Sequence, residues 1–141
     1  MFNNFFKKKE ENKPNNKNVF AASLLVHAAR MDKNYTDLEK KIIKKALINL
    51  NNISLEQAEK LLIEAEKKED SSNQIIEFTK EIKQQSMEYK LKIIEVVWKI
   101  VYSDGISDSY ESNLIRRICG LLYISDRDSG IIKTKVQNSL K

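Results

Sequence analysis

The chain is poor in residues that break helices and in residues that cross-link small folds. Its 141 residues include three glycines, one proline and one cysteine. So little turn chemistry argues against a sandwich or a barrel, and the many Lys, Glu, Ile and Leu residues favour an all-α fold. The single cysteine, Cys119, excludes an internal disulfide and a multi-cysteine zinc site. We expect Cys119 in the core, because it lies within an apolar helical run.

Long apolar runs and a one-sided distribution of charge are also missing. No run reaches the roughly 18–20 residues that a membrane-spanning helix needs, and the first residues lack the order of charge, apolar stretch and small residues of a signal peptide. We therefore expect a cytoplasmic protein. The formal net charge is +5, but residues 1–18 hold five lysines and two glutamates. Elsewhere Lys and Glu alternate along the helices, which excludes the basic face typical of a nucleic-acid binder.

Two regions are expected: a flexible basic arm over residues 1–18 and a helical domain over residues 19–141. The arm is polar, rich in Asn and Lys, and holds the only proline. Its start has the composition of a short segment that lies on an anionic inner membrane surface, through Phe2, Phe5, Phe6, Lys7, Lys8 and Lys9. The alternative is a disordered leader with no membrane contact.

Hydrophobic periodicity predicts about seven helices. They cover roughly residues 19–32, 36–50, 54–68, 73–82, 86–102, 109–123 and 126–136. The first and fifth are apolar almost all round, so we expect both at the centre of the fold. Capping boxes predict where the second and third helices begin, with Thr36 before Glu39 and Ser54 before Gln57. The apolar stripes of the second, third and seventh helices start at Leu38, Leu55 and Ile131.

The first three predicted helices resemble the last three at a spacing of 72 residues. The aligned positions are Asp32 with Asp104, Glu39 with Glu111, Ile42 with Leu114, and Leu50 with Leu122. Two such three-helix units can bury their apolar first helices against each other across an approximate two-fold axis. The fourth helix then links the two units.

Each unit places an Asp at the end of one helix and a Glu in the first turn of the next. An EF-hand is excluded, because its sixth position counted from Asp104 is Ser109 instead of Gly, and its twelfth is Ile115 instead of Glu. Capping explains Glu39 and Glu111. It does not explain the aspartates, since negative charge near a helix C-terminus is unfavourable. Bonds to loop amides and a divalent cation between the two acids both remain open.

Signs of catalysis are few. His27, the only histidine, lies on the apolar first helix, where a packed or rim role is the usual one. The sequence contains no Gly-rich phosphate loop, no H-E-x-x-H pair and no nucleophile motif. We therefore do not expect an enzyme.

These features resemble the TerB family, the tellurite-resistance B-like domain, in its stand-alone bacterial branch. The similarity covers about residues 19–136. Its most specific part is the second unit, with Trp98, the Tyr-x-Asp-Gly of residues 102–105, Glu111 and the pair Arg116-Arg117. The stretch AASLLVHAARMDKNYTDLEKKII resembles the first unit.

The resemblance implies an all-helical fold with an internal repeat and an acidic cluster that binds divalent metal in a stress-response or membrane-associated assembly. By position, that cluster is Asp32, Glu39, Asp104 and Glu111. Many relatives have a further Glu at the positions of His27 and Lys99, so His27 would add a ligand suited to zinc and Lys99 would remove one. Calcium and manganese suit the oxygen ligands. The leading hypothesis is a non-enzymatic module that binds such a cation and docks a protein partner; the alternative is a structural adaptor with capping carboxylates, recruited to membrane by the arm.

Overall fold

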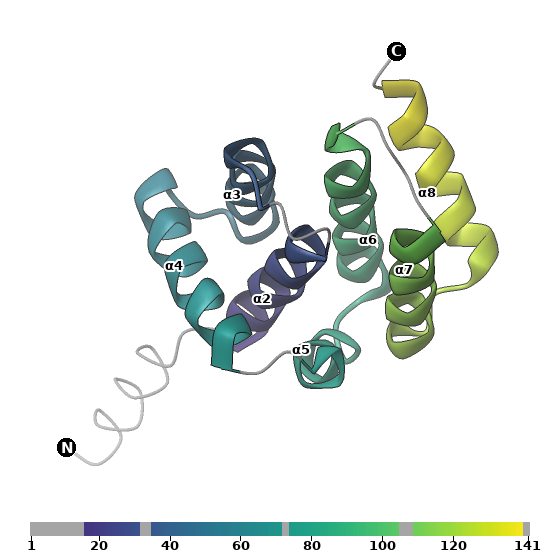
Figure 1. Ribbon diagram of the computed structural model, residues 1–141. Coiled ribbons are helices and arrows are strands. Elements are labelled where there is room, and N and C mark those ends of the chain that lie inside the picture. Colours follow the sequence, from purple (N-terminus) through teal and green to yellow (C-terminus); the bar gives the residue numbers. More distant parts are fainter. Residues whose placement is uncertain (1–15, 32–34, 72–73, 105–108, 140–141) are drawn as a thin grey trace.

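Helices make up almost all of the described structure, and no strand occurs in it. The computed structural model describes residues 16–31, 35–71, 74–104 and 109–139, with the backbone alone for residues 16, 104 and 109–112. The all-α prediction is therefore confirmed (Figure 1). The elements are α2 (Asn16–Arg30), α3 (Asp37–Asn51), α4 (Leu55–Ser71), α5 (Ile75–Ile82), α6 (Met87–Val101), the 3-10 turn η1 (Tyr102–Asp104), α7 (Ser109–Leu122) and α8 (Asp126–Ser139).

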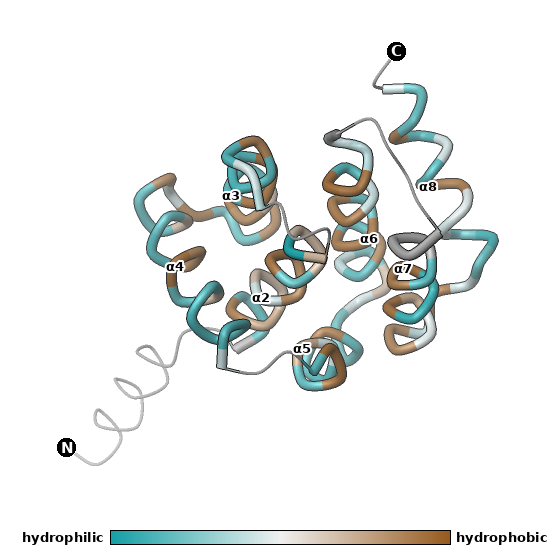
Figure 2. The backbone as a smooth tube through the Cα atoms, in the orientation of Figure 1, coloured by the Kyte–Doolittle hydropathy of each residue, from teal (hydrophilic) through white to brown (hydrophobic). Residues whose placement is uncertain are grey.

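The two helices predicted to be central, α2 and α6, lie side by side in the middle of the molecule (Figure 1). Both are rich in apolar residues, which appear in brown along the two helices in Figure 2. In α2 the side chains of Leu24, Leu25 and Val26 are fully buried although they are consecutive, as are Ile93 and Ile94 in α6. A helix that buries adjacent residues must be enclosed on several sides.

The predicted repeat is visible in how the helices pack. α2 packs on α3 and α4, and α6 packs on α7 and α8, while α2 and α6 contact each other. Equivalent helices also end alike, since the residues that follow α3 and α7, Asn52 and Tyr123, both have left-handed backbones with φ of 53° and 60°. The linker helix α5 packs against both α2 and α7 and buries Ile75, Phe78 and Ile82.

Side-chain caps start the helices where the sequence predicts them. The Oγ1 of Thr36 accepts from the backbone N–H of Glu39 at 3.1 Å, and the Oγ of Ser54 does the same for Gln57 at 3.1 Å. Ser86 caps α6 and Ser125 caps α8 in the same way. Each cap stabilises the fold by about 1 kcal/mol, because it satisfies an amide that the helix leaves unpaired.

Three apolar residues predicted to face inward are more than half exposed. Leu38 and Leu55 lie in the first turns of α3 and α4, at the ends of these helices. On α8 the inward face is Ser129, partly buried Ile132 and Val136, and Ile131 points about 100° away from Ile132. Cys119 is buried, as predicted. Within the described ranges, no helix has both the length and the apolar content to cross a membrane.

Candidate functional site

The residues of the predicted acidic site belong to two equivalent corners of the fold. Glu39 lies in the first turn of α3, and Glu111 occupies the same place in α7. Asp104 is the last residue of η1, directly after α6. Asp32 lies outside the described residues, as do the side chains of Asp104 and Glu111 and the whole segment from Phe2 to Lys9 with Phe5, Phe6, Lys7 and Lys8.

The Glu39 carboxylate is fixed by the helix cap. Its Oε1 accepts from the backbone N–H of Thr36 at 2.8 Å and from the Thr36 hydroxyl at 3.1 Å. The residue is only 4% exposed. The capping box is therefore complete, and it holds a carboxylate in a buried position at the corner between α2 and α3.

His27 points toward α4 and α5. Its Nδ1 lies 3.4 Å from Oε1 of Glu69, and its ring lies 6.1 Å from that of Phe78 in a tilted arrangement. The same Glu69 carboxylate accepts from the guanidinium of Arg30. The Glu69 carboxylate therefore contacts both His27 and Arg30.

Four side chains, His27, Arg30, Glu69 and Asp70, join α2 to α4, and we call them the α2–α4 clamp. Arg30 Nη1 donates to Glu69 and, at 2.7 Å, to Oδ1 of Asp70. Burial opposes the charge on Arg30, but the two carboxylates outweigh it and raise the pKa of the guanidinium. Sequence reasoning missed the clamp, because Arg30 and Glu69 are 39 residues apart and no local pattern links them.

Two cationic side chains contact the ring of Tyr35 beside the first corner. The ring of Tyr35 lies between Arg30, 5.2 Å from its centroid, and Lys40, at 4.9 Å. Burial, with the nearby Glu66 carboxylate, raises the pKa of Tyr35 well above its usual value, so the phenol is neutral. Lys40 also pairs with Glu66 at 4.0 Å. These contacts fix both ends of the connection between α2 and α3.

The second corner is anchored to α8. Trp98 stacks on Tyr102 with 5.8 Å between ring centroids, and its Nε1 donates to Oγ of Ser129 at 3.2 Å. The Tyr102 hydroxyl accepts from Nε2 of Gln137 at 2.9 Å. The residues that make the second unit distinctive in sequence therefore hold η1 in place. Lys99, one turn before η1, lines a cavity between α3 and α6.

Comparison with known families decides what this arrangement is. The model of the family described as tellurite resistance protein TerB matches residues 18–134. The chain belongs to the TerB family. The family model covers both corners, the α2–α4 clamp and the two central helices, so the resemblance drawn from the sequence is confirmed. No curated protein and no solved structure gives a significant match.

A metal site of the TerB kind can be tested against the donors whose positions are known. Across residues with described side chains, no three His, Cys, Asp or Glu residues are grouped closely enough to hold an ion. His27 lies beside Glu69 at 3.4 Å, and a metal-binding role for His27 stays a prediction. Glu39 has the chemistry of a cation ligand, and its carboxylate is buried beside the start of α3. The other predicted donors are carboxylates as well.

Proposed function

We propose that this TerB protein is a non-catalytic module that binds a divalent cation at its inter-helix corners and docks a partner protein in a stress-response assembly. Asp32 with Glu39 would bind the ion in the first unit, and Asp104 with Glu111 in the second. The observation that carries the proposal is the buried, pre-positioned carboxylate of Glu39 at a corner that the fold repeats. The bonds from Thr36 hold this carboxylate in place before any ion binds, which supports a site that needs little rearrangement.

The donor chemistry favours calcium or manganese over zinc. Carboxylate and carbonyl oxygens suit hard cations, whereas zinc prefers nitrogen and sulfur ligands. His27 is the one nitrogen donor expected near the first corner, and the other predicted ligands are carboxylates. A bound ion would neutralise the paired acids and rigidify the corner. The charge of the protein surface at the corner would then depend on whether the ion is bound.

The decisive experiment separates capping from ion binding at one residue. Glu39→Gln keeps an oxygen that can accept from Thr36, because Gln57 already completes an equivalent cap beside Ser54. It removes the negative charge. We expect Glu39→Gln and Asp104→Asn to keep the helical circular dichroism of the full chain and to weaken calcium or manganese binding, measured by isothermal titration calorimetry, by at least tenfold.

Asp37→Asn is the matched control. Asp37 is an exposed acid in the first turn of α3, two residues from Glu39 but absent from the proposed ligand set. It should bind the ions as the unchanged chain does. Absence of binding heat for calcium, manganese and zinc would remove the cation proposal, and an equal loss in Asp37→Asn would reduce it to a general charge effect.

The adaptor alternative predicts a different result. If the carboxylates only cap helices, membrane recruitment would depend on the arm. Co-sedimentation with anionic vesicles would then be lost when Phe2, Phe5 and Phe6 are changed to Ser in the full chain, because these are the only aromatic side chains of residues 1–18. Equal sedimentation of both proteins would remove the role of the arm.

A further inference from the structure

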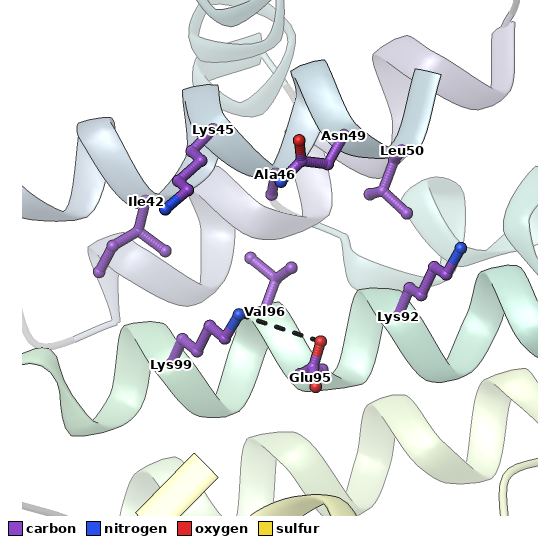
Figure 3. A pocket seen from close by; sticks show the side chains of 9 residues that line it. All are labelled: Ile42, Lys45, Ala46, Asn49, Leu50, Lys92, Glu95, Val96 and Lys99. Carbon is purple, nitrogen blue, oxygen red and sulfur yellow. Dashed lines mark ion pairs between the residues drawn. The ribbon is translucent and has the colours of Figure 1, made fainter. Parts of the chain in front are cut away.

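A cavity of about 350 Å³ lies between α3 and α6. Its volume falls at the lower end of the range for small-molecule sites. The lining comes from one face of each helix (Figure 3): Ile42, Lys45, Ala46, Asn49 and Leu50 from α3, and Lys92, Glu95, Val96 and Lys99 from α6.

The two units face each other along two seams, where α2 faces α7 and where α3 faces α6. The cavity lies at the second seam, because the linker helix α5 fills the first. On one side of the central pair, α5 fills the space between α2 and α7 with Phe78 and Ile82. On the other side α3 packs directly on α6, and the cavity lies between these two helices. A cavity there is open to a ligand.

One wall of the cavity is apolar. Ile42, Ala46 and Leu50 are spaced four residues apart on α3, so they form a continuous strip. Val96 faces them from α6 and is almost fully buried. In Figure 3, Lys45 reaches from α3 and Lys99 from α6 into the space between the helices, beside this strip. An apolar wall with convergent polar groups is typical of a small-molecule site.

The charge of the lining is positive. Three lysines and one glutamate give the lining a net charge of +2. Glu95 is already engaged, with Oε1 at 2.7 Å from Lys135 and Oε2 at 3.9 Å from Lys99. Lys45 has no carboxylate partner among the described side chains, whereas Lys92 pairs with Glu88 at 3.3 Å on the surface. The cavity therefore lacks anionic charge on its α3 side.

We propose that the cavity binds a phosphate monoester that carries a short apolar group. A phosphomonoester has a charge between about −1.5 and −2 at neutral pH, which matches the lining. Lysine ammonium groups bind phosphate as point charges, and the Asn49 amide can donate to a phosphate oxygen. The apolar group would lie on the strip of Ile42, Ala46 and Leu50. A soluble phosphate ester and the headgroup of a phosphatidic acid share this chemistry.

The test uses hexyl phosphate as the probe and the isotope-labelled full chain in NMR titrations. Saturable shifts should be confined to the amides of residues 42–50 and 92–99. Lys45→Gln with Lys99→Gln should weaken binding about tenfold, since each exposed ion pair changes affinity several-fold at most. Ile42→Ala should weaken hexyl phosphate but not inorganic phosphate. Lowering the pH below about 6 should weaken binding, because the phosphate then loses its second charge.

Lys60→Gln with Lys67→Gln is the matched control, because it removes two positive charges from the exposed face of α4. It should bind the probe as the unchanged chain does. Shifts that do not saturate, or an equal loss in this control, would overturn the proposal.

Vesicles of phosphatidylcholine with phosphatidic acid distinguish the two sources of the phosphate. They are tested on the full chain with Phe2, Phe5 and Phe6 changed to Ser, so that the arm does not contribute. Sedimentation with these vesicles that depends on Lys45 and Lys99 identifies the lipid headgroup as the ligand of the cavity. Binding of hexyl phosphate without sedimentation identifies a soluble phosphate ester as the ligand. If the chain neither binds hexyl phosphate nor sediments with the vesicles, the proposed site is refuted.

Discussion

Glu69 gives the sharpest test of how the first unit is held together. Its carboxylate is the member of the α2–α4 clamp that touches both Arg30 and His27, and its side chain is only 10% exposed. Glu69→Ala removes a charge-assisted hydrogen bond, which is worth about 1.5–3 kcal/mol. Arg30 keeps Asp70 as a partner and is itself about a quarter exposed, so we expect about 2 kcal/mol of the free energy of unfolding to be lost.

The assay is urea unfolding of the full chain, followed by far-ultraviolet circular dichroism. A loss of about 2 kcal/mol is a large share of the 5–15 kcal/mol that stabilises a typical domain, and lowers Tm by roughly 6–8 °C at this chain length. Glu69→Gln should cost about half as much, because the amide oxygen still accepts from Arg30 while the charge is gone. Asp70→Ala is the matched control: it removes the same type of partner from the same guanidinium.

Burial separates the two acids. Asp70 is 69% exposed, so water replaces its contact with Arg30, and its loss should cost about 0.5 kcal/mol. If Asp70→Ala destabilises the protein as much as Glu69→Ala, burial does not set the strength of the clamp. A double-mutant cycle of Arg30→Ala with Glu69→Ala should give a coupling energy above about 1 kcal/mol. A coupling near zero would refute the reasoning.

Three further predictions concern single groups. Burial raises the pKa of Tyr89 to about 12. The stability that the neutral phenol contributes is therefore complete below about pH 10 and is lost as the pH rises toward 12. In urea unfolding at a series of pH values, Tyr89→Phe should show a smaller decline of the free energy of unfolding over this range. Ser129→Ala leaves the buried indole N–H of Trp98 without its partner and should cost about 1–3 kcal/mol in the same assay. Burial raises the pKa of the Cys119 thiol, so a thiol reagent should modify the native protein far more slowly than the unfolded chain.

The sequence was sufficient for the fold because the signals that place helices are local. Apolar periodicity located the seven α-helices of the described ranges, and the boxes at Thr36 and Ser54 located two helix starts to the residue. Periodicity failed at Leu38 and Leu55, since it reports which face of a helix is apolar but not where the neighbouring helices end. Burial at a helix terminus depends on the lengths of other elements, which a local pattern does not contain.

The site was predictable to a smaller extent, for the same reason. The contact between Thr36 and Glu39 spans three residues and could be read from the sequence, whereas the contact between Arg30 and Glu69 spans 39. His27 illustrates the difference. By sequence it is a metal ligand or a packed residue, and its actual partner, Glu69, becomes evident only once α4 lies against α2. The cation at the corners remains a prediction, with Glu39 as the acid whose side-chain position is known.

The two corners are equivalent, whereas the two sides of the central helix pair are filled differently. Residues 72 apart are equivalent, so Lys99 and Glu95 of the cavity correspond to His27 and Ser23 in the first unit. Ser23 is fully buried and donates to its own helix, and His27 lies near Phe78 of α5. Next to the linker helix the chain therefore carries small or neutral side chains at these positions, and at the interface of α3 with α6 it carries charges. The two units share equivalent corners but differ on these faces, because the one linker helix packs on one side of the central pair.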